Sequence, residues 1–284
     1  MTEATLGDVL RFEGIGLHTG AHAVVEVAPA PAGSGIAFVL RRSGDSASVV
    51  VPAVVENVVD TSRATVMGRD GATVSTTEHL LSALFGMGVT NAEIRVDGPE
   101  IPVGDGSAKG FADAIDAAGI VTQNRPRATL ALDAPFAVSV ADRMVAVFPA
   151  PAFRVRCVVD FPAPIGAQYF YGEIDAAFYR REIAGARTFG YFHEVEALRE
   201  RGLALGGSLE NALVFAPDGP MQPLRWHDEV VRHKVLDLIG DFSLLGVWPQ
   251  CEVVAIKSGH ELHATATRAL RARPSVPSTS SPHT

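Results

Sequence analysis

The sequence predicts an α+β protein built from two similar halves. Each half begins with short segments rich in β-branched residues and then reads as a helix, a strand and a second helix. A polar stretch that contains a proline separates the halves at residues 123–127, so we place the domains at residues 1–124 and 127–270. We expect each domain to be a sheet with two helices on one side, and the helices of the two domains to face one another.

The first half contains the clearer helix signals. Leu80, Ala83, Leu84 and Met87 recur at helical spacing and predict one apolar face, and the glycines that follow end the helix. The elements predicted for this half are strands at residues 24–27, 36–40, 49–59 and 92–96 and helices at residues 77–86 and 108–118.

The second half repeats this plan with one interruption. Its main helix, residues 229–245, has a predicted buried side formed by Val231, Val235, Leu238, Phe242 and Leu245. The other predicted elements are strands at residues 129–131, 137–140, 144–148, 154–159 and 251–256 and a last helix at residues 262–270. Residues 187–215 form an insert with a short helix at 194–201 and a strand at 212–215. Residues 271–284, rich in Pro, Ser and Thr, are predicted to be a disordered tail.

Composition excludes some classes of protein. The 284 residues carry a net charge of −8, which argues against a general nucleic-acid binder. The two cysteines form no Cys-x-x-Cys motif, so a reducing compartment is expected. Residues 1–14 lack the pattern of a signal peptide, and no apolar run approaches the ~20 residues of a membrane helix. We expect a monomeric cytoplasmic protein, with transient contact at a membrane surface left open.

Two segments far apart in the chain carry residues suited to metal chemistry. Glu78 and His79 are adjacent, and His233 and Asp237 lie one helical turn apart. A catalytic zinc uses three His or carboxylate ligands and one open position, and a nearby carboxylate can serve as base. His260 follows a glycine and is a candidate acid.

Each of these pieces also has a structural interpretation. Ser75-Thr76-Thr77-Glu78 fits a helix capping box, in which the Glu78 side chain returns to the first backbone N–H. Glu229, His233, Asp237 and Asp241 form a stripe of charge that is typical of a solvated helix face. A histidine after a glycine, such as His260, is usually a turn or surface residue.

A series of motifs decides between these interpretations by occurring together. They are residues 12–20, Phe-Glu-Gly-Ile-Gly-Leu-His-Thr-Gly; the Glu-His pair within 77–81; 97–100, Asp-Gly-Pro-Glu; Asp105 to Ser107; 186–190, Ala-Arg-Thr-Phe-Gly; 206–208, Gly-Gly-Ser; the segment from Arg232 to Asp241; and 257–260, Lys-Ser-Gly-His. In this order they resemble the UDP-3-O-acyl-N-acetylglucosamine deacetylases, zinc amidohydrolases of the committed step of lipid A synthesis. The resemblance runs from about Phe12 to Leu270 and implies a two-domain α+β sandwich.

The resemblance also implies roles. It gives one catalytic zinc the ligands His79, His233 and Asp237. It makes Glu78 the general base for the water and His260 the acid for the departing amine. Lys234 and Thr188 would stabilise the oxyanion, and Asp241 would orient His260.

Contacts with an acylated UDP-sugar follow in the same way. The insert at 187–215 matches a passage for the acyl chain, with Leu203, Ala204 and Ser208 in its wall. Asp160 and Phe161 match a segment that contacts uracil, and Lys257, assisted by Arg143, matches a phosphate-side position. Phe189 and His18 complete the implied substrate-binding set.

The sequence departs from the family at a few positions. His263 stands where the family usually has Asn, and an extra imidazole there would alter local charge or compete for metal. Ala204 stands where a cysteine commonly lines the passage, and the loop at 216–226 is short.

Three alternatives stay open on the sequence. Ferrous iron also accepts two histidines and one carboxylate, so the ion is zinc or Fe²⁺. The chain is also compatible with a related amidohydrolase for another N-acylated sugar. A binding paralogue with a structural metal would need a fourth ligand, for which His18 and His263 are the candidates.

Overall fold

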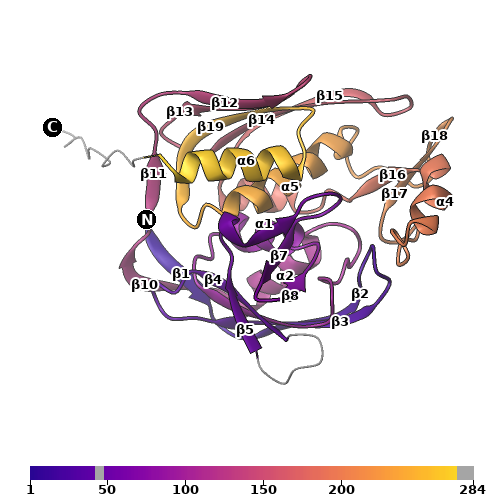
Figure 1. Cartoon of the computed structure of the whole chain (residues 1–284). Coiled ribbons are helices and arrows are strands. Elements are labelled where there is room, and N and C mark those ends of the chain that lie inside the picture. Colours follow the sequence, from indigo (N-terminus) through magenta and orange to yellow (C-terminus); the bar gives the residue numbers. More distant parts are fainter. Residues whose placement is uncertain (42–47, 274–284) are drawn as a thin grey trace.

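The structure, a computed structural model, describes residues 1–41 and 48–273 (Figure 1). The first half contains β1 (Thr2–Leu6), β2 (Leu10–Ile15), β3 (His22–Pro29), β4 (Ile36–Arg41), β5 (Ser48–Pro52), a 3₁₀ turn (Val55–Asn57), β6 (Val58–Asp60), β7 (Val66–Arg69), β8 (Ala72–Val74), α1 (Glu78–Gly86), β9 (Ala92–Asp97), α2 (Lys109–Ala118) and β10 (Ile120–Pro126). The second half contains β11 (Thr129–Ala131), β12 (Phe136–Val140), β13 (Arg143–Pro149), β14 (Arg154–Phe161), β15 (Gly166–Glu173), α3 (Ala176–Phe178), a π-turn (Tyr179–Ile183), β16 (Phe189–Tyr191), α4 (Phe192–Glu200), β17 (Leu213–Ala216), β18 (Gly219–Pro220), α5 (Glu229–Ser243), β19 (Trp248–Ile256) and α6 (His260–Arg271).

Two sheets enclose the helices. Figure 1 shows the sheet with β12–β15 and β19 along the top, the sheet with β2–β5 along the bottom, and α1, α2, α5 and α6 between them. The predicted α+β sandwich, with helices that face across the interface, is therefore confirmed. A single cluster of buried apolar residues runs through both halves, because the helices present apolar side chains to both sheets.

The two main sheets repeat one topology. Their strand orders are β2-β3-β9-β4-β5 and β12-β13-β19-β14-β15, and β11 adds a parallel edge to β19. In each sheet the central strand follows a helix and pairs in parallel with one neighbour, β9 with β4 and β19 with β14. The repeat read from the sequence is thus present in the fold.

Some sequence expectations need correction. The polar segment at 123–127 is no free linker, because most of it belongs to β10, which pairs antiparallel with β1. The domain limits stay a prediction. The strand predicted at 49–59 is broken into β5, a 3₁₀ turn and β6, and the Pro/Gly-rich segment after β14 contains an eight-residue strand, β15. All nine residues of α1 are buried, so the helix does not have a single apolar face.

The insert and the tail differ from the core. The insert carries β16, α4 and β17 and lies at one side of the sandwich (Figure 1). None of the residues of α4 is buried. At the other end, α6 continues through Arg271, so the predicted tail begins in a helix, and residues 274–284 lie outside the described residues. No helix in the described parts of the chain is long and apolar enough to cross a membrane.

Candidate active site

The predicted metal ligands come together between α1 and α5. Oδ1 of Asp237 lies 3.4 Å from Nε2 of His233 and 3.7 Å from Nε2 of His79. The ligand atoms of the three residues all lie within 4.8 Å of one another, and each residue is at most 4% exposed. The charged stripe of α5 therefore faces the protein interior, and its interpretation as a solvated face is wrong.

The protein around these three groups keeps them in protonation states that favour binding of a cation. Nδ1 of His233 donates to the carbonyl of Ala186 at 3.1 Å, which leaves Nε2 as the free nitrogen. Burial lowers the pKa of both imidazoles, that of His79 to about 3, so both are neutral and keep a lone pair. Burial opposes the charge of Asp237, but the neighbouring groups that favour its charge, Lys234 first among them, together outweigh burial and hold the pKa of that carboxyl well below its usual value.

One buried atom of the cluster lacks a partner that its chemistry requires. Within the described residues no donor reaches Oδ1 of Asp237, whereas Oδ2 accepts a hydrogen bond from Nζ of Lys234 at 2.6 Å. A buried carboxylate oxygen without a hydrogen bond is costly, and a metal ion would satisfy it. Two neutral imidazoles and this oxygen therefore fit a divalent cation of the zinc or ferrous type.

Glu78 lies beside this cluster as the first residue of α1. Its Oε2 accepts a hydrogen bond from the backbone N–H of Thr65 at 3.0 Å, and its Oε1 is 3.9 Å from Nε2 of His260. The capping-box interpretation is wrong, because no side chain caps α1 and the backbone N–H of Ser75 donates to the carbonyl of Pro99. Burial raises the pKa of Glu78 to about 7, which suits a general base near neutral pH.

The candidate acid is oriented from α5. Nδ1 of His260 donates to Oδ2 of Asp241 at 2.8 Å, which directs Nε2 toward Glu78. Burial opposes the charge of His260, but the charge and hydrogen bond of Asp241 raise its pKa to about 9. His260 is therefore protonated at neutral pH, as an acid must be, and it is not a surface histidine.

Backbone features bring the two helices close enough to form the site. Gly240 of α5 packs on the start of α1, where a Cβ would lie 2.1 Å from the carbonyl oxygen of Glu78. Thr76, just before α1, has a φ of 57°, which β-branched residues rarely adopt. Its hydroxyl donates to Glu100 at 2.7 Å, and this contact helps to hold the strained turn.

Sequence reasoning missed Thr65 and Arg63. The backbone N–H of Thr65 bonds to Glu78 and its hydroxyl donates to Asp241 at 2.5 Å, so this residue links the candidate base to the support of the acid. Arg63 lines a cavity of about 480 Å³ together with Arg143, Lys234 and His260. The positive charge of Arg63 was a signal in the sequence, but a threonine in a loop carries none.

The candidate oxyanion donors have different surroundings. Lys234 borders the cavity, and in the structure its amine bonds to Asp237. The backbone N–H of Thr188 donates to the carbonyl of Gly106 at 2.7 Å. Thr188 lies two residues after Ala186, whose carbonyl accepts from His233.

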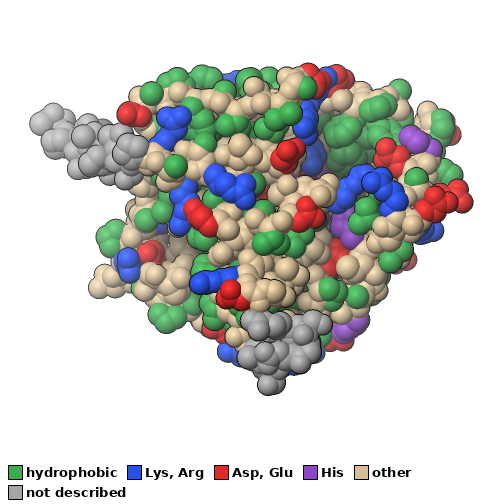
Figure 2. Space-filling view, in the orientation of Figure 1, with side chains coloured by type: hydrophobic (Ala, Val, Ile, Leu, Met, Phe, Trp, Pro, Cys, Tyr) green, Lys and Arg blue, Asp and Glu red, His purple; other side chains and the backbone are tan. Residues whose placement is uncertain are grey.

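Aromatic rings extend from the metal cluster toward the sheet. Phe189 lies with its ring centroid 6.1 Å from His233 and 5.1 Å from Phe161. Beyond them, Nζ of Lys257 lies 2.8 Å from a carboxylate oxygen of Asp160. Figure 2 shows hydrophobic side chains gathered in the region between β15 and the strands of the insert. The predicted nucleotide contacts are therefore neighbours in space.

The insert contacts the first half near His18. The backbone N–H of Leu205 donates to the carbonyl of His18 at 3.1 Å, and Leu203 and Ala204 are half-buried beside this contact. Ser208 is exposed, and its hydroxyl accepts from the N–H of Glu210 in a local turn. The backbone N–H of His18 donates to the carboxylate of Glu100 at 3.0 Å, whereas its Nδ1 is buried and has no partner in the described ranges.

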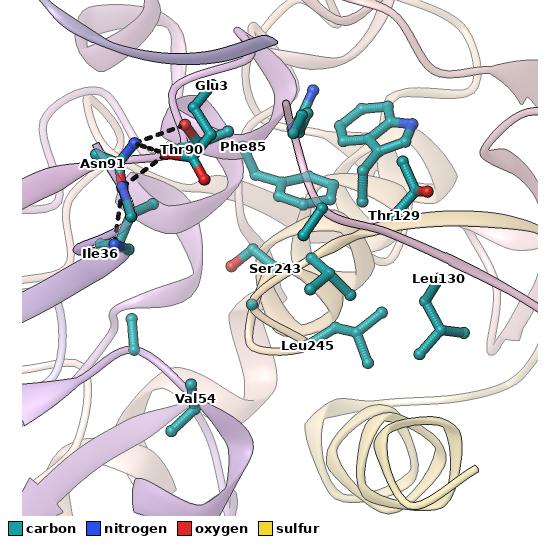
Figure 3. Close-up of a pocket in the computed structure, with 18 of the residues that line it drawn as sticks. Glu3, Ile36, Val54, Phe85, Thr90, Asn91, Thr129, Leu130, Ser243 and Leu245 are labelled. Atoms are coloured by element: carbon teal, nitrogen blue, oxygen red, sulfur yellow. Dashed lines mark hydrogen bonds between the residues drawn. The ribbon is translucent and has the colours of Figure 1, made fainter. Parts of the chain in front are cut away.

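A larger cavity lies elsewhere and contains none of the predicted site residues. It measures about 700 Å³ and opens at the C-terminal ends of α1 and α5, where Figure 3 shows Phe85, Ser243 and Leu245 in the middle of the lining residues. Across it, the side chain of Asn91 donates to Glu3 at 3.0 Å. We interpret this cavity as part of the seam between the halves.

The fold and the site together define a class of protein. Two neutral imidazoles and a carboxylate oxygen, with a buried carboxylic base and an imidazolium acid beside them, are the parts of a metal-dependent hydrolase. The family model described as UDP-3-O-acyl N-acetylglycosamine deacetylase matches residues 3–272. The chain belongs to this family.

Curated relatives agree with the family model. The chain is 44% identical to the UDP-3-O-acyl-N-acetylglucosamine deacetylase of Myxococcus xanthus, over 96% of this chain and 87% of the relative. The deacetylases of Syntrophotalea carbinolica (92% of this chain, 85% of the relative) and Trichormus variabilis (93% and 96%) are also 44% identical.

Proposed function

We propose that this chain removes the N-acetyl group of UDP-3-O-acyl-N-acetylglucosamine by hydrolysis, with one zinc ion held by His79, His233 and Asp237. The products would be acetate and UDP-3-O-acyl-glucosamine, in the committed step of lipid A biosynthesis. The observation that carries the proposal is Oδ1 of Asp237, which faces both imidazoles without a donor in the described residues. Family membership supplies the substrate class.

An amide resists hydrolysis because its carbonyl is a weak electrophile and its amine is a poor leaving group. Bound zinc supplies a Lewis acid that polarises the carbonyl and lowers the pKa of water. Glu78 takes a proton from the attacking water, and the new C–O bond forms at the acetyl carbon. His260 gives its Nε2 proton to the nitrogen as the C–N bond breaks, which releases a neutral amine. Each proton transfer typically contributes ~10²–10⁴-fold.

The remaining groups would bind charge and orient the substrate. Lys234 and Thr188 stabilise the oxyanion that develops at the acetyl oxygen. Arg63 and Arg143 line one cavity, so their positive charges suit the diphosphate. Asp160 and Phe161 would contact the uracil, and Lys257, whose Nζ lies 2.8 Å from a carboxylate oxygen of Asp160, would bind a phosphate.

The acyl chain would lie along the insert, against Leu203 and Ala204, with Phe189 between it and the metal ligands. Ser208 and His18 border this passage. We place the reaction in the cytoplasm and the protein as a monomer that meets the membrane surface only transiently. Both cysteines are free and buried, in keeping with a reducing compartment.

A comparison of two substrates tests this function against its nearest alternative. Acetate release is measured with UDP-3-O-acyl-N-acetylglucosamine and with UDP-N-acetylglucosamine, which lacks the acyl chain. We expect kcat/KM to be at least ~10²-fold higher for the acylated substrate, because its chain adds buried apolar area. Equal values would instead favour an amidohydrolase for another N-acylated sugar.

A further inference from the structure

The carboxylate that orients the candidate acid is shared with a second histidine. Oδ2 of Asp241 accepts from Nδ1 of His260 and from Nδ1 of His263, each at 2.8 Å. The two histidines are the first and fourth residues of α6, so they point from one face of that helix toward α5. His263 is 1% exposed and Asp241 is equally buried.

The hydrogen-bond partners define which atoms carry protons. An ionised carboxylate can only accept, so both Nδ1 atoms must be donors. Burial lowers the pKa of His263, which is therefore neutral with a lone pair on Nε2. That nitrogen lies 2.8 Å from Oγ of Ser258, whose hydroxyl donates to it. Every polar atom of the His263 ring is then satisfied, and its orientation is determined at both ends.

The geometry also determines the position of Asp241. Its Oδ1 accepts from the hydroxyl of Thr65, and its Oδ2 accepts from the two imidazoles. Without His263, Oδ2 would have only His260 as a ring donor, and the carboxylate could turn together with that ring. The direction of Nε2 of His260 toward Glu78 depends on this carboxylate.

We propose that His263 is a positioning residue for the reaction: by donating to the oxygen that also holds His260, it locks Asp241 and aims the acid. This inference rests on the proposed function, since it assigns His260 as the acid. His263 itself touches neither the metal ligands nor the substrate cavity in the described residues. The sequence suggested that it would perturb charge or compete for metal; the ligand atoms of Asp241, His260 and His263 lie within 4.8 Å of one another, so a second metal equivalent is the competing outcome of the test.

Two substitutions separate the hydrogen bond from simple packing. His263→Asn keeps a side-chain N–H donor, whereas His263→Leu fills similar space without one. We expect His263→Leu to lower kcat by about 10–100-fold with KM within about 2-fold, the usual effect of losing such a support. His263→Asn should recover most of the loss.

A matched control is available on the same helix. Thr267 lies one turn further along α6, is fully buried, and its hydroxyl has no partner in the described part of the chain. Thr267→Ala should lower Tm, as His263→Leu does, without lowering kcat. Equal kcat values for His263→Leu and wild type would overturn the proposal, as would a loss in His263→Asn as large as that in His263→Leu.

Nitrogen-15 NMR of histidine-labelled, zinc-loaded protein tests the arrangement independently of activity. We expect the signal that disappears in His263→Asn to come from a neutral ring protonated at Nδ1. A ring protonated at Nε2, or a second bound metal equivalent that is lost in His263→Asn, would overturn the proposal. If wild type released no acetate from the acylated UDP-sugar, the proposed function would fail, and the role assigned to His263 would fail with it even where the NMR signal is as expected.

Discussion

Nε2 of His233 lies 3.4 Å from Oδ1 of Asp237, which is one turn further along α5. That oxygen accepts no hydrogen bond from any described residue. Because a metal would satisfy the oxygen, Asp237→Asn should weaken binding by at least the ~10–100-fold typical of losing an outer partner. Metal per chain after equilibration with a chelator measures this. Asp133→Asn removes an exposed carboxylate and should keep the wild-type value. Full retention of metal in Asp237→Asn would contradict the ligand assignment.

Glu78→Gln separates the base from the ligands. The amide fills the same space and can still accept the hydrogen bond from Thr65, but it cannot take a proton. We expect kcat to fall ~10²–10⁴-fold while metal content and Tm stay near those of wild type. Elemental analysis, a melting curve and a turnover assay on one preparation check this. A variant that keeps its metal and most of its turnover would exclude Glu78 as the base.

The pH profile should have two limbs. Glu78 must be ionised, and burial raises its pKa to about 7, so activity should rise as pH increases through this range. A bound cation favours the carboxylate and would move this limb to lower pH. His260 must be protonated, and Asp241 raises its pKa to about 9 against the effect of burial, so activity should fall above that pH.

The kcat/KM values between pH 5 and 10 measure both limbs. His260→Gln should be less active than wild type, and its residual activity should not fall at alkaline pH. If that variant kept the same alkaline limb as wild type, the limb would belong to another group.

Part of the candidate site was predictable because its sequence signals are local, whereas the assignment of metal ligands came from the resemblance to the deacetylase family. His233 and Asp237 share a helix face by spacing alone, and Glu78 is adjacent to His79. That the charged face of α5 is buried was not predictable, because the burial depends on packing against α1. That helix ends more than 140 residues before α5 begins. The capping box failed for the same reason: Glu78 accepts from the backbone N–H of Thr65, and the backbone N–H of Ser75 donates to Pro99.

The edges of the fold were also hidden in the sequence. β10 is exposed and polar, so it looks like a linker, and only its pairing with β1 makes it a strand. β15 alternates but lies in a segment with prolines and glycines, which favoured a loop. His263 was visible as an unusual residue, but its contact with Asp241 depends on how α6 packs on α5.

Gly240→Ala should damage the site through packing alone. A Cβ at this position would lie 2.1 Å from the carbonyl oxygen of Glu78, so one of the helices must move. We expect a loss of roughly 1–3 kcal/mol of unfolding free energy and a lower kcat, because the base moves with α1. Gly110→Ala in α2, where a Cβ meets nothing within 4 Å, should be neutral or stabilising. Urea unfolding compares the two, and a fully stable, active Gly240→Ala would contradict the close approach.

In the proposed mechanism, His79, His233 and Asp237 hold one catalytic metal ion for deacetylation. The most direct test is acetate release from UDP-3-O-acyl-N-acetylglucosamine before chelation, after chelation and after zinc is added back. We expect release to stop when the metal is removed and to return in full at one zinc per chain. Release that continues at the same rate from metal-free protein, or no release from folded protein that holds one zinc, would contradict it.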